Sequence, residues 1–178
     1  MNTELVLIRH TQVAVSGVCY GRLDVPLAAS FASEAAILQG HCAGLTADQI
    51  YTSPAHRCSL LAQRLFSARV IADTRLQELD FGAWEGRRWD DIGEPAITAW
   101  AADYIHHAPP DGESYAQLAQ RVAAFLETIA ASGAQQVVAI THAGVIRAAH
   151  ALLNGLPLKK SFEFQPAYGG IYRYNLSP

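Results

Sequence analysis

The chain has 178 residues, of which 51% are hydrophobic and 16% are charged, with a formal net charge of -3. This size and apolar content suit one compact domain over residues 1–178 rather than two small domains. A weakly acidic chain has no global positive field that would attract nucleic acid or an anionic membrane, so any bound anion must be held by locally clustered positive charge.

Cysteine usage and hydropathy indicate the compartment. Cys19, Cys42 and Cys58 form no CxxC pair and cannot all form intramolecular disulfides, which favours reduced thiols. The N-terminus has no positive stretch followed by a long apolar core, and no segment approaches the roughly 20 apolar residues of a membrane span. We therefore expect a cytoplasmic protein with no membrane partner.

The first half of the chain alternates between predicted strands and helices. The apolar run Leu5–Ile8 is typical of a buried strand in a parallel sheet. Ser53 and Pro54 are typical of an N-cap and a first helical position. In chain order we predict a strand, a loop that lines a site, an alanine-rich helix, a strand, a helix and a strand, over residues 5–8, 11–30, 30–45, 49–52, 54–68 and 70–72.

The second half begins with an irregular segment over residues 79–112, which contains all three tryptophans. It is too long for an ordinary connection, so we predict an excursion over the sheet edge and the active site. Ser114 and Gln117 then fit a capping box that opens a helix. A strand at 136–140, a helix ending near Leu153 and one or two closing strands within 161–176 complete the pattern. Alternating strands and helices predict an α/β fold, a three-layer sandwich with a central, mostly parallel sheet flanked by helices.

Two predicted strands end in histidine-bearing segments, at Arg9-His10 and at His142. Ligands of open α/β sheets bind outside the carboxyl ends of the strands, so both imidazoles face one crevice if these strands are neighbours. Arg57 lies in the first turn of a predicted helix, where a cation is unfavourable unless an anion is nearby. Each residue alone is explained more simply as a core histidine or a solvated arginine. Together they predict an anion site, because burying such a set without an anion is costly.

Five motifs follow one another between residues 7 and 147: Leu7-Ile8-Arg9-His10-Thr11, Thr52-Ser53-Pro54-Ala55-His56-Arg57, Glu78-Leu79-Asp80-Phe81-Gly82-Ala83-Trp84-Glu85-Gly86, Gly112-Glu113-Ser114 and Thr141-His142-Ala143-Gly144-Val145-Ile146-Arg147. In type and order they resemble the signatures of the histidine phosphatase family, also called the phosphoglycerate mutase-like family. The tail after Leu153 adds no specific match. Thr11 stands where the family has glycine, which would matter if the backbone there needed a positive φ. Ala143 stands where glycine is common.

The resemblance implies a phosphatase that works in two steps through a phosphohistidine. His10 would attack phosphorus, while Arg9 and Arg57 would hold the phosphoryl oxygens. His142 would be a further catalytic donor, and Ala143 would belong to the phosphate site. The positive charge of the arginines should favour the neutral, nucleophilic form of His10.

The resemblance also implies a general acid four residues before the glycine of Phe81-Gly82, and this position favours Glu78. Asp80 is the nearest competitor, and a surface salt bridge is the simpler explanation for either carboxylate. No metal and no cofactor are expected, because the arginines supply the positive charge. His106 and His107 are interpreted as a solvated pair rather than metal ligands, since adjacent histidines point apart in regular structure.

Two motifs, Arg9-His10-Thr11-x-Val13 and Cys19-Tyr20-Gly21-x-x-Asp24-Val25-Pro26-Leu27, resemble one branch of the α-ribazole phosphatases. These enzymes remove the 5′-phosphate from a benzimidazole nucleoside in cobalamin assembly. The resemblance predicts that the partner is a small phosphorylated metabolite, with Tyr20 and Gly21 in contact with it. The aromatic residues of the excursion, Phe81, Trp84 and Trp89, either stack on such a leaving group or only pack the excursion onto the sheet. The second explanation is the simpler one. A homodimer is compatible with the sequence, which does not fix the oligomeric state.

Two other functions remain open. A phosphoglycerate mutase would return the phosphoryl group to its product, but mutases of this family are longer between the second and third motifs, so hydrolysis is preferred. A non-catalytic module would only bind phosphorylated ligands. The presence of His10 and Glu78 argues against it, because binding alone needs no general acid.

Overall fold

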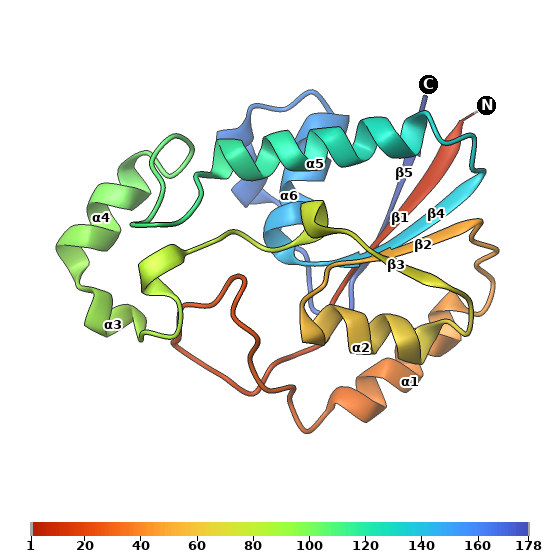
Figure 1. Ribbon diagram of the computed structural model, residues 1–178, viewed down its shortest axis with the longest axis horizontal. Coiled ribbons are helices and arrows are strands. Elements are labelled where there is room, and N and C mark those ends of the chain that lie inside the picture. The colour runs from red at the N-terminus through yellow and green to blue at the C-terminus, as the bar shows by residue number, and fades with distance from the viewer. Residues whose placement is uncertain (1, 178) are drawn as a thin grey trace.

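The computed structural model describes residues 2–177, which contain a sheet of five strands in the order β3-β2-β4-β1-β5 (Figure 1). Met1 and Pro178 lie outside the described residues. The strands are β1 (Thr3–Arg9), β2 (Gln49–Thr52), β3 (Val70–Ala72), β4 (Gln136–Thr141) and β5 (Ile171–Leu176). The first four run parallel, and β5 pairs antiparallel with β1. The predicted mostly parallel sheet is therefore confirmed.

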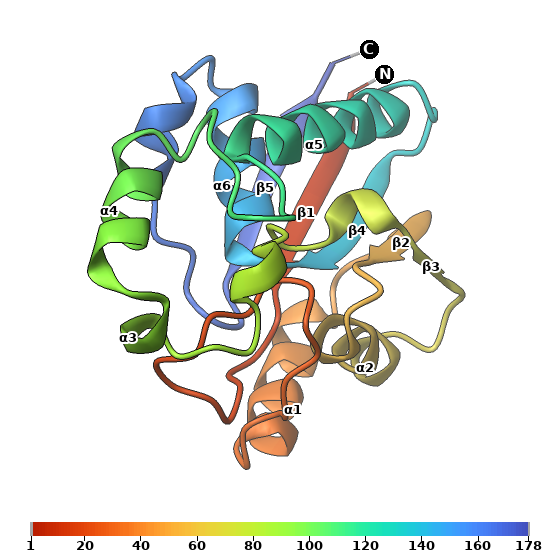
Figure 2. The same cartoon turned by 60° about the vertical axis from the view of Figure 1, so that its left-hand side comes forward.

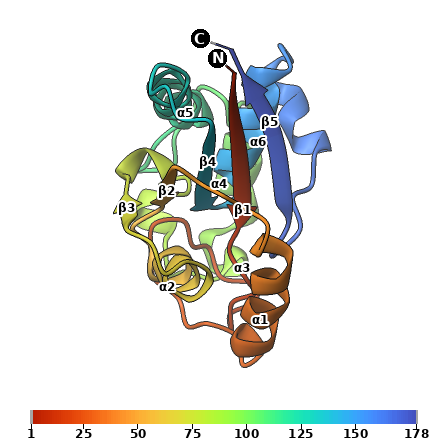
Figure 3. The same ribbon diagram turned by 90° about the vertical axis from the view of Figure 1, so that its right-hand side faces the viewer.

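Helices cover both faces of the sheet, as the edge-on view shows (Figure 3). The helices are α1 (Phe31–Cys42), α2 (His56–Leu65), α5 (Tyr115–Ala130) and α6 (Ala143–Leu153). Alternate residues of β1 enter two separate cores: Val6 and Ile8 pack with α1 and α2, and Leu5 and Leu7 pack with α5 and α6. Because β1 is buried on both faces, its sequence is a continuous apolar run rather than an alternating one. The three-layer arrangement is thus confirmed.

The irregular segment after β3 lies beyond the end of the sheet where β1 and β4 finish (Figures 1 and 2). It contains the 3-10 turns Thr74–Leu76 and Gly82–Trp84 and the helices α3 (Trp89–Ile92) and α4 (Glu94–Ala102). Its aromatic rings pack on one another: the Trp84 ring lies 6.5 Å from Trp89 and 5.8 Å from Trp100 between centroids. Trp84 is buried in this cluster, so it holds the segment together.

The start of α2 differs from the sequence prediction. The predicted start of α2 at Pro54 with Ser53 as N-cap is wrong: Ala55 is the N-cap and His56 the first helical residue. The Ser53 hydroxyl instead lies 2.8 Å from Nε2 of His142, a tertiary contact that local capping patterns do not contain. Within residues 2–177 the tail contains one closing strand, β5, within the one or two that were predicted, and Leu158–Glu163 is a 3-10 turn. The capping box of Ser114 and Gln117 at the start of α5 is confirmed.

Candidate active site

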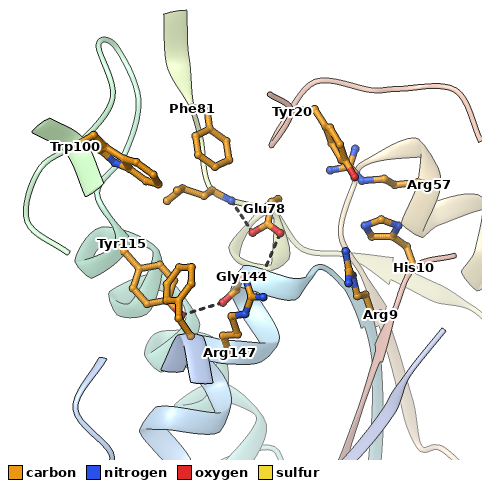
Figure 4. Close-up of a pocket in the computed structure, with 12 residues that line it drawn as sticks. Arg9, His10, Tyr20, Arg57, Glu78, Phe81, Trp100, Tyr115, Gly144 and Arg147 are labelled. Carbon is orange, nitrogen blue, oxygen red and sulfur yellow. Dashed lines mark hydrogen bonds between the residues drawn. The ribbon is translucent and has the colours of Figure 1, made fainter. Parts of the chain in front are cut away.

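A cavity of about 150 Å³ lies where β1, α2 and α6 meet the irregular segment (Figure 4). Among the residues singled out from the sequence, Arg9, His10, Tyr20, Arg57, Glu78 and Phe81 line it. They come from parts of the chain that are distant in sequence. The sheet and the helix α2 bring them to one place.

The pairing of β1 with β4 explains why the two histidines meet. The strands are parallel neighbours, with Arg9 opposite Thr141. The residues that follow, His10 and His142, therefore leave the sheet side by side, and their ring centroids are 5.2 Å apart. The strand-end argument from the sequence correctly predicted this convergence.

The Nδ1 atom of His10 lies 2.7 Å from the carbonyl oxygen of Thr11. A carbonyl can only accept, so Nδ1 carries the hydrogen. Burial lowers the pKa of His10 to about 3, and the charges of Arg57 and Arg9 contribute to the shift. The ring is therefore neutral near pH 7, with its free lone pair on Nε2. This is the form that a nucleophilic histidine requires.

Arg57 is completely buried on α2. Its Nη1 donates to the carbonyl oxygen of Leu23 at 3.0 Å, and its Nη2 donates to that of Gly21 at 2.5 Å. Its one ion pair within residues 2–177 is with the exposed Asp24, at 4.0 Å. Its Nε has no hydrogen-bond partner in the same residues. A buried guanidinium with a free donor and a distant counter-charge favours an anion beside it.

Arg9 is held differently. Its Nη1 donates to the carbonyl oxygen of Pro166 at 2.7 Å, and its guanidinium lies 3.7 Å from the centre of the Tyr168 ring. The Nε of Arg9 also has no partner in the described part of the chain. The hydroxyls of Tyr168 and Tyr20 lie 3.1 Å apart, and the Tyr20 ring lies 5.3 Å from the guanidinium carbon of Arg57. Tyr168 therefore contacts Arg9 and Tyr20 contacts Arg57, and the two tyrosines are within hydrogen-bond distance of each other.

His142 is fully buried behind the cavity rather than on its wall. Its Nε2 lies 2.8 Å from the Ser53 hydroxyl and 3.5 Å from Sγ of Cys58. Burial, with a contribution from Arg57, holds its pKa well below the usual value for histidine. Burial also raises the pKa of the Cys58 thiol. Both groups are therefore neutral near pH 7.

Two other predicted residues, Ala143 and Gly21, are close to the site without lining the cavity. Ala143 is the first residue of α6, and Gly21 supplies the carbonyl that holds Arg57. A Cβ on Gly21 would lie 1.7 Å from the carbonyl oxygen of Leu79, so only glycine allows these two backbones to touch. Contact of Ala143 and Gly21 with phosphate or substrate stays a prediction.

Glu78 reaches the first turn of α6. Its Oε2 accepts a hydrogen bond from the backbone N–H of Gly144 at 3.1 Å, and its Oε1 accepts one from Leu79 at 2.9 Å (Figure 4). Asp80 is used elsewhere: its Oδ1 accepts from the backbone of Gly82 at 2.9 Å, and its Oδ2 lies 3.0 Å from Arg22. Asp80 does not line the cavity. The geometry therefore favours Glu78 as the carboxylate that meets a ligand.

The wall opposite His10 is aromatic. Its rings come from the irregular segment, α5 and the 3-10 turn after α6, and belong to Phe81, Trp100, Tyr115 and Phe162. Arg147 lies at this wall, with its guanidinium 4.9 Å from the centre of the Phe162 ring. Of the three residues discussed for stacking, only Phe81 reaches the cavity. Trp100 and Phe162 were not singled out from the sequence, although clustered aromatic residues around 81–104 were a usable signal. Arg147 was part of the fifth motif but was given no role.

Thr11 causes no strain at the position where the family has glycine. Among residues 2–177 the only non-glycine residue with a positive φ is Asp111. Thr11 is completely buried, and its hydroxyl has no hydrogen-bond partner in the same residues. The threonine therefore fits the backbone, and its hydroxyl is the unusual feature.

The remaining sequence features are simple to place. Within residues 2–177, no group of three His, Cys, Asp or Glu side chains is arranged as metal ligands. His106 and His107 are exposed, with Nδ1 atoms 2.9 and 3.8 Å from the carboxylate oxygens of Asp103. All three cysteines are free and buried. None of the described helices is both long and apolar enough to cross a membrane.

Known proteins with similar sequences and structures include phosphatases and a mutase. The family model of the histidine phosphatase superfamily (branch 1) matches residues 5–178. A putative phosphoserine phosphatase 2 from Hydrogenobacter thermophilus is 29% identical over 94% of this chain and 87% of its own length. A 2,3-bisphosphoglycerate-dependent phosphoglycerate mutase from Azorhizobium caulinodans is 32% identical over 99% of this chain and 93% of its own. The crystal structure of the α-ribazole phosphatase from Shigella flexneri superimposes with a TM-score of 0.89, at 28% identity, over 96% of this chain and 89% of that one.

Proposed function

The chain belongs to the histidine phosphatase superfamily, and from this premise we propose that it hydrolyses a small phosphomonoester through a phosphohistidine on His10. One observation carries the proposal. The bond from Nδ1 of His10 to the Thr11 carbonyl leaves a neutral Nε2 beside two guanidiniums that each have a buried, unpartnered Nε within residues 2–177. These are a nucleophile and the donors for the oxygens of the group that it attacks.

In the first step, Nε2 of His10 forms a bond to phosphorus while the ester P–O bond breaks. Arg9 and Arg57 hold the phosphoryl oxygens and stabilise their charge. The departing oxygen takes a proton from the Glu78 carboxyl group. We also propose His142 as a further donor; its Nε2 contacts Ser53 behind the cavity, so its ring must turn to reach the phosphoryl group. Its neutral ring adds no positive charge that would weaken the nucleophile.

In the second step, Glu78 as carboxylate takes a proton from water, and the water oxygen attacks phosphorus on the opposite side from His10. The P–N bond breaks, orthophosphate leaves, and both residues return to their starting forms. The same side chain is thus acid in one step and base in the next. No metal takes part in this scheme, because the guanidiniums provide the positive charge.

For the substrate we propose α-ribazole-5′-phosphate. The aromatic wall of Phe81, Trp100, Tyr115 and Phe162 supports a leaving group that carries a planar aromatic base, because aromatic rings stack on one another. The segment over residues 79–112 then covers the bound leaving group as part of the same domain. We also propose a cytoplasmic location, in keeping with the free cysteines, and leave a homodimer to be tested by size-exclusion chromatography with light scattering.

A mutase remains the alternative. The match to the mutase relative spans 196 residues over 99% of this 178-residue chain, so that relative carries extra residues within the matched region. This is in keeping with hydrolysis but does not decide it. What separates the two activities is the fate of the phosphohistidine. A hydrolase gives it to water, whereas a mutase keeps it long enough to return it to a product alcohol. A module that only binds phosphorylated ligands would form no phosphohistidine at all.

The test is phosphate release from p-nitrophenyl phosphate, α-ribazole-5′-phosphate and phosphoserine, with and without a chelator, beside His10→Ala. We expect metal-independent release with the highest kcat/KM for the ribazole ester, and loss of turnover in the variant. Release that survives in His10→Ala would disprove the nucleophile. Loss of turnover with the chelator would disprove the metal-free scheme, and a preference for phosphoserine would overturn the substrate. Incubation with 3-phosphoglycerate and 2,3-bisphosphoglycerate would reveal a mutase as isomerisation faster than phosphate release.

A further inference from the structure

We propose that Arg121 on α5 is a positioning residue for Glu78, and that it acts by holding the backbone from which this carboxyl group projects. The proposal rests on the proposed role of Glu78 as general acid. Arg121 does not line the cavity, so it touches neither substrate nor the reacting atoms. Its effect on the reaction must therefore pass through the segment that it binds.

Arg121 binds three backbone carbonyls in the segment that leads to Glu78. Its Nη1 donates to the carbonyl oxygens of Arg75 at 2.7 Å and Gln77 at 2.6 Å, and its Nη2 donates to that of Glu78 at 3.1 Å. One rigid guanidinium thus fixes the Glu78 peptide to α5. A lysine, with a single ammonium group, cannot reproduce this fork of donors.

Glu113 fixes the guanidinium from the other side. Its Oε2 accepts from Nε of Arg121 at 3.1 Å, and its Oε1 accepts from Nη2. The Oε1 atom also accepts from the backbone N–H of Asp80 at 3.1 Å, while the N–H of Glu113 donates to the Asp80 carbonyl at 2.9 Å. The pair of Arg121 and Glu113 therefore holds the backbone on both sides of residues 78 and 79.

Tight placement matters here because the Glu78 carboxylate has little free space. It lies between its own backbone and Gly144. A Cβ added to Gly144 would lie only 2.2 Å from Oε1. A general acid must lie within hydrogen-bond reach of the leaving oxygen, and a misplacement of about 1 Å can cost about 100-fold in rate. Loosening the Glu78 peptide would therefore impair proton transfer before it impaired phosphate binding, which depends on Arg9 and Arg57.

The experiment compares two substrates of nearly the same shape, phenyl phosphate and p-nitrophenyl phosphate, in the full-length protein. Phenolate is a strong base and needs the proton from Glu78 as it leaves, whereas p-nitrophenolate leaves readily without it. The quantity measured is kcat/KM, because it reports transfer to His10 regardless of how fast the phosphohistidine is hydrolysed. Circular dichroism and thermal unfolding check that each variant is folded.

Three variants are needed. Glu78→Gln should lower kcat/KM for phenyl phosphate about 100-fold and that for p-nitrophenyl phosphate less than about tenfold. Arg121→Lys keeps the positive charge and should show the same selectivity with smaller losses. We expect kcat/KM to fall about tenfold for phenyl phosphate and less than about threefold for p-nitrophenyl phosphate. Arg75→Lys is the matched control, since Arg75 also ties this segment to α5, through the Ala124 carbonyl and the Thr128 hydroxyl, but does not bind the Glu78 peptide. It should lower both values equally or not at all.

The outcomes separate the two proposals. Equal losses on both substrates in Glu78→Gln would overturn the acid itself. Selective loss in Glu78→Gln with equal or no loss in Arg121→Lys would leave the acid in place and overturn the positioning role. If Arg121→Lys does not fold, Glu113→Gln replaces it, since this variant keeps Arg121 but weakens the contact that fixes its guanidinium. The same selectivity is then expected, and its absence overturns the proposal.

Discussion

The Glu78 carboxylate and the backbone of Gly144 fill one narrow gap: Oε2 accepts the Gly144 N–H at 3.1 Å, and a Cβ on Gly144 would lie 2.2 Å from Oε1. Gly144→Ala must therefore displace the proposed acid. We expect kcat/KM for phenyl phosphate to fall about 100-fold, with the chain still folded. Steady-state kinetics and circular dichroism measure the two parts of this prediction.

The matched control for Gly144→Ala is Gly40→Ala. Gly40 lies inside α1, and a Cβ added there would meet no neighbouring side chain or loop within 4 Å, so alanine fits. The change should raise the free energy of unfolding by about 0.5–1 kcal/mol through helix propensity and leave kcat/KM unchanged. If Gly144→Ala keeps the wild-type kcat/KM, the proposed acid does not depend on the position of the Glu78 carboxylate beside Gly144.

Acid should destabilise the protein through its buried histidines. The folded-state pKa of His10 is lowered to about 3 and that of His142 lies well below the ordinary value of 6.5, so the unfolded chain binds more protons than the folded one. The resulting stability is fully present above pH 6.5 and is lost as the pH falls from 6.5 towards 3, at up to about 1.4 kcal/mol per pH unit for each histidine. Urea unfolding at a series of pH values measures this slope, which should be smaller in His10→Asn. An unchanged slope in His10→Asn would mean that His10 is protonated in the folded state.

Thr11→Val removes the buried hydroxyl that has no partner within residues 2–177. An unpaired buried hydroxyl costs about 1–3 kcal/mol, so we expect valine, which has nearly the same shape, to raise the free energy of unfolding by about 1 kcal/mol. The Thr11 carbonyl that accepts from His10 is unchanged, so kcat/KM should stay within about twofold. A marked rise in KM would instead show that the hydroxyl binds the phosphoryl group.

Tyr168 should contribute to phosphate affinity through Arg9. Its ring lies 3.7 Å from the guanidinium carbon, and a cation–π contact of this kind is worth about 0.5–2 kcal/mol. Tyr168→Leu should raise the inhibition constant of orthophosphate about fivefold through loss of this contact. Tyr168→Phe keeps the ring and loses only the contact with the Tyr20 hydroxyl, so it is the control, with a smaller effect expected. Equal effects of the two changes would assign the role to the hydroxyl instead.

The sequence was sufficient for features that depend on local pattern and strand direction. The apolar runs of β1 and β4 predicted their burial, and their shared direction predicted that His10 and His142 meet. Ser53 shows the limit of local pattern, because its hydroxyl has a partner that lies 89 residues away in sequence rather than in the adjacent helix. Tyr168 and Phe162 show the same limit. They reach the site because the chain after α6 folds back over it before β5 begins, and no local pattern records that contact.

The order of the sheet has a consequence for how the protein is made. β1 is an early segment, but its two neighbours, β4 and β5, are the last strands of the described chain. During synthesis the apolar run of β1 therefore remains without either neighbour until nearly all of the sheet has been translated. Unpaired apolar strands are prone to aggregate, and pairing between distant segments is slow. The nascent chain should thus be prone to aggregate until β4 has been translated, and His10 and His142 can meet only when that strand is placed.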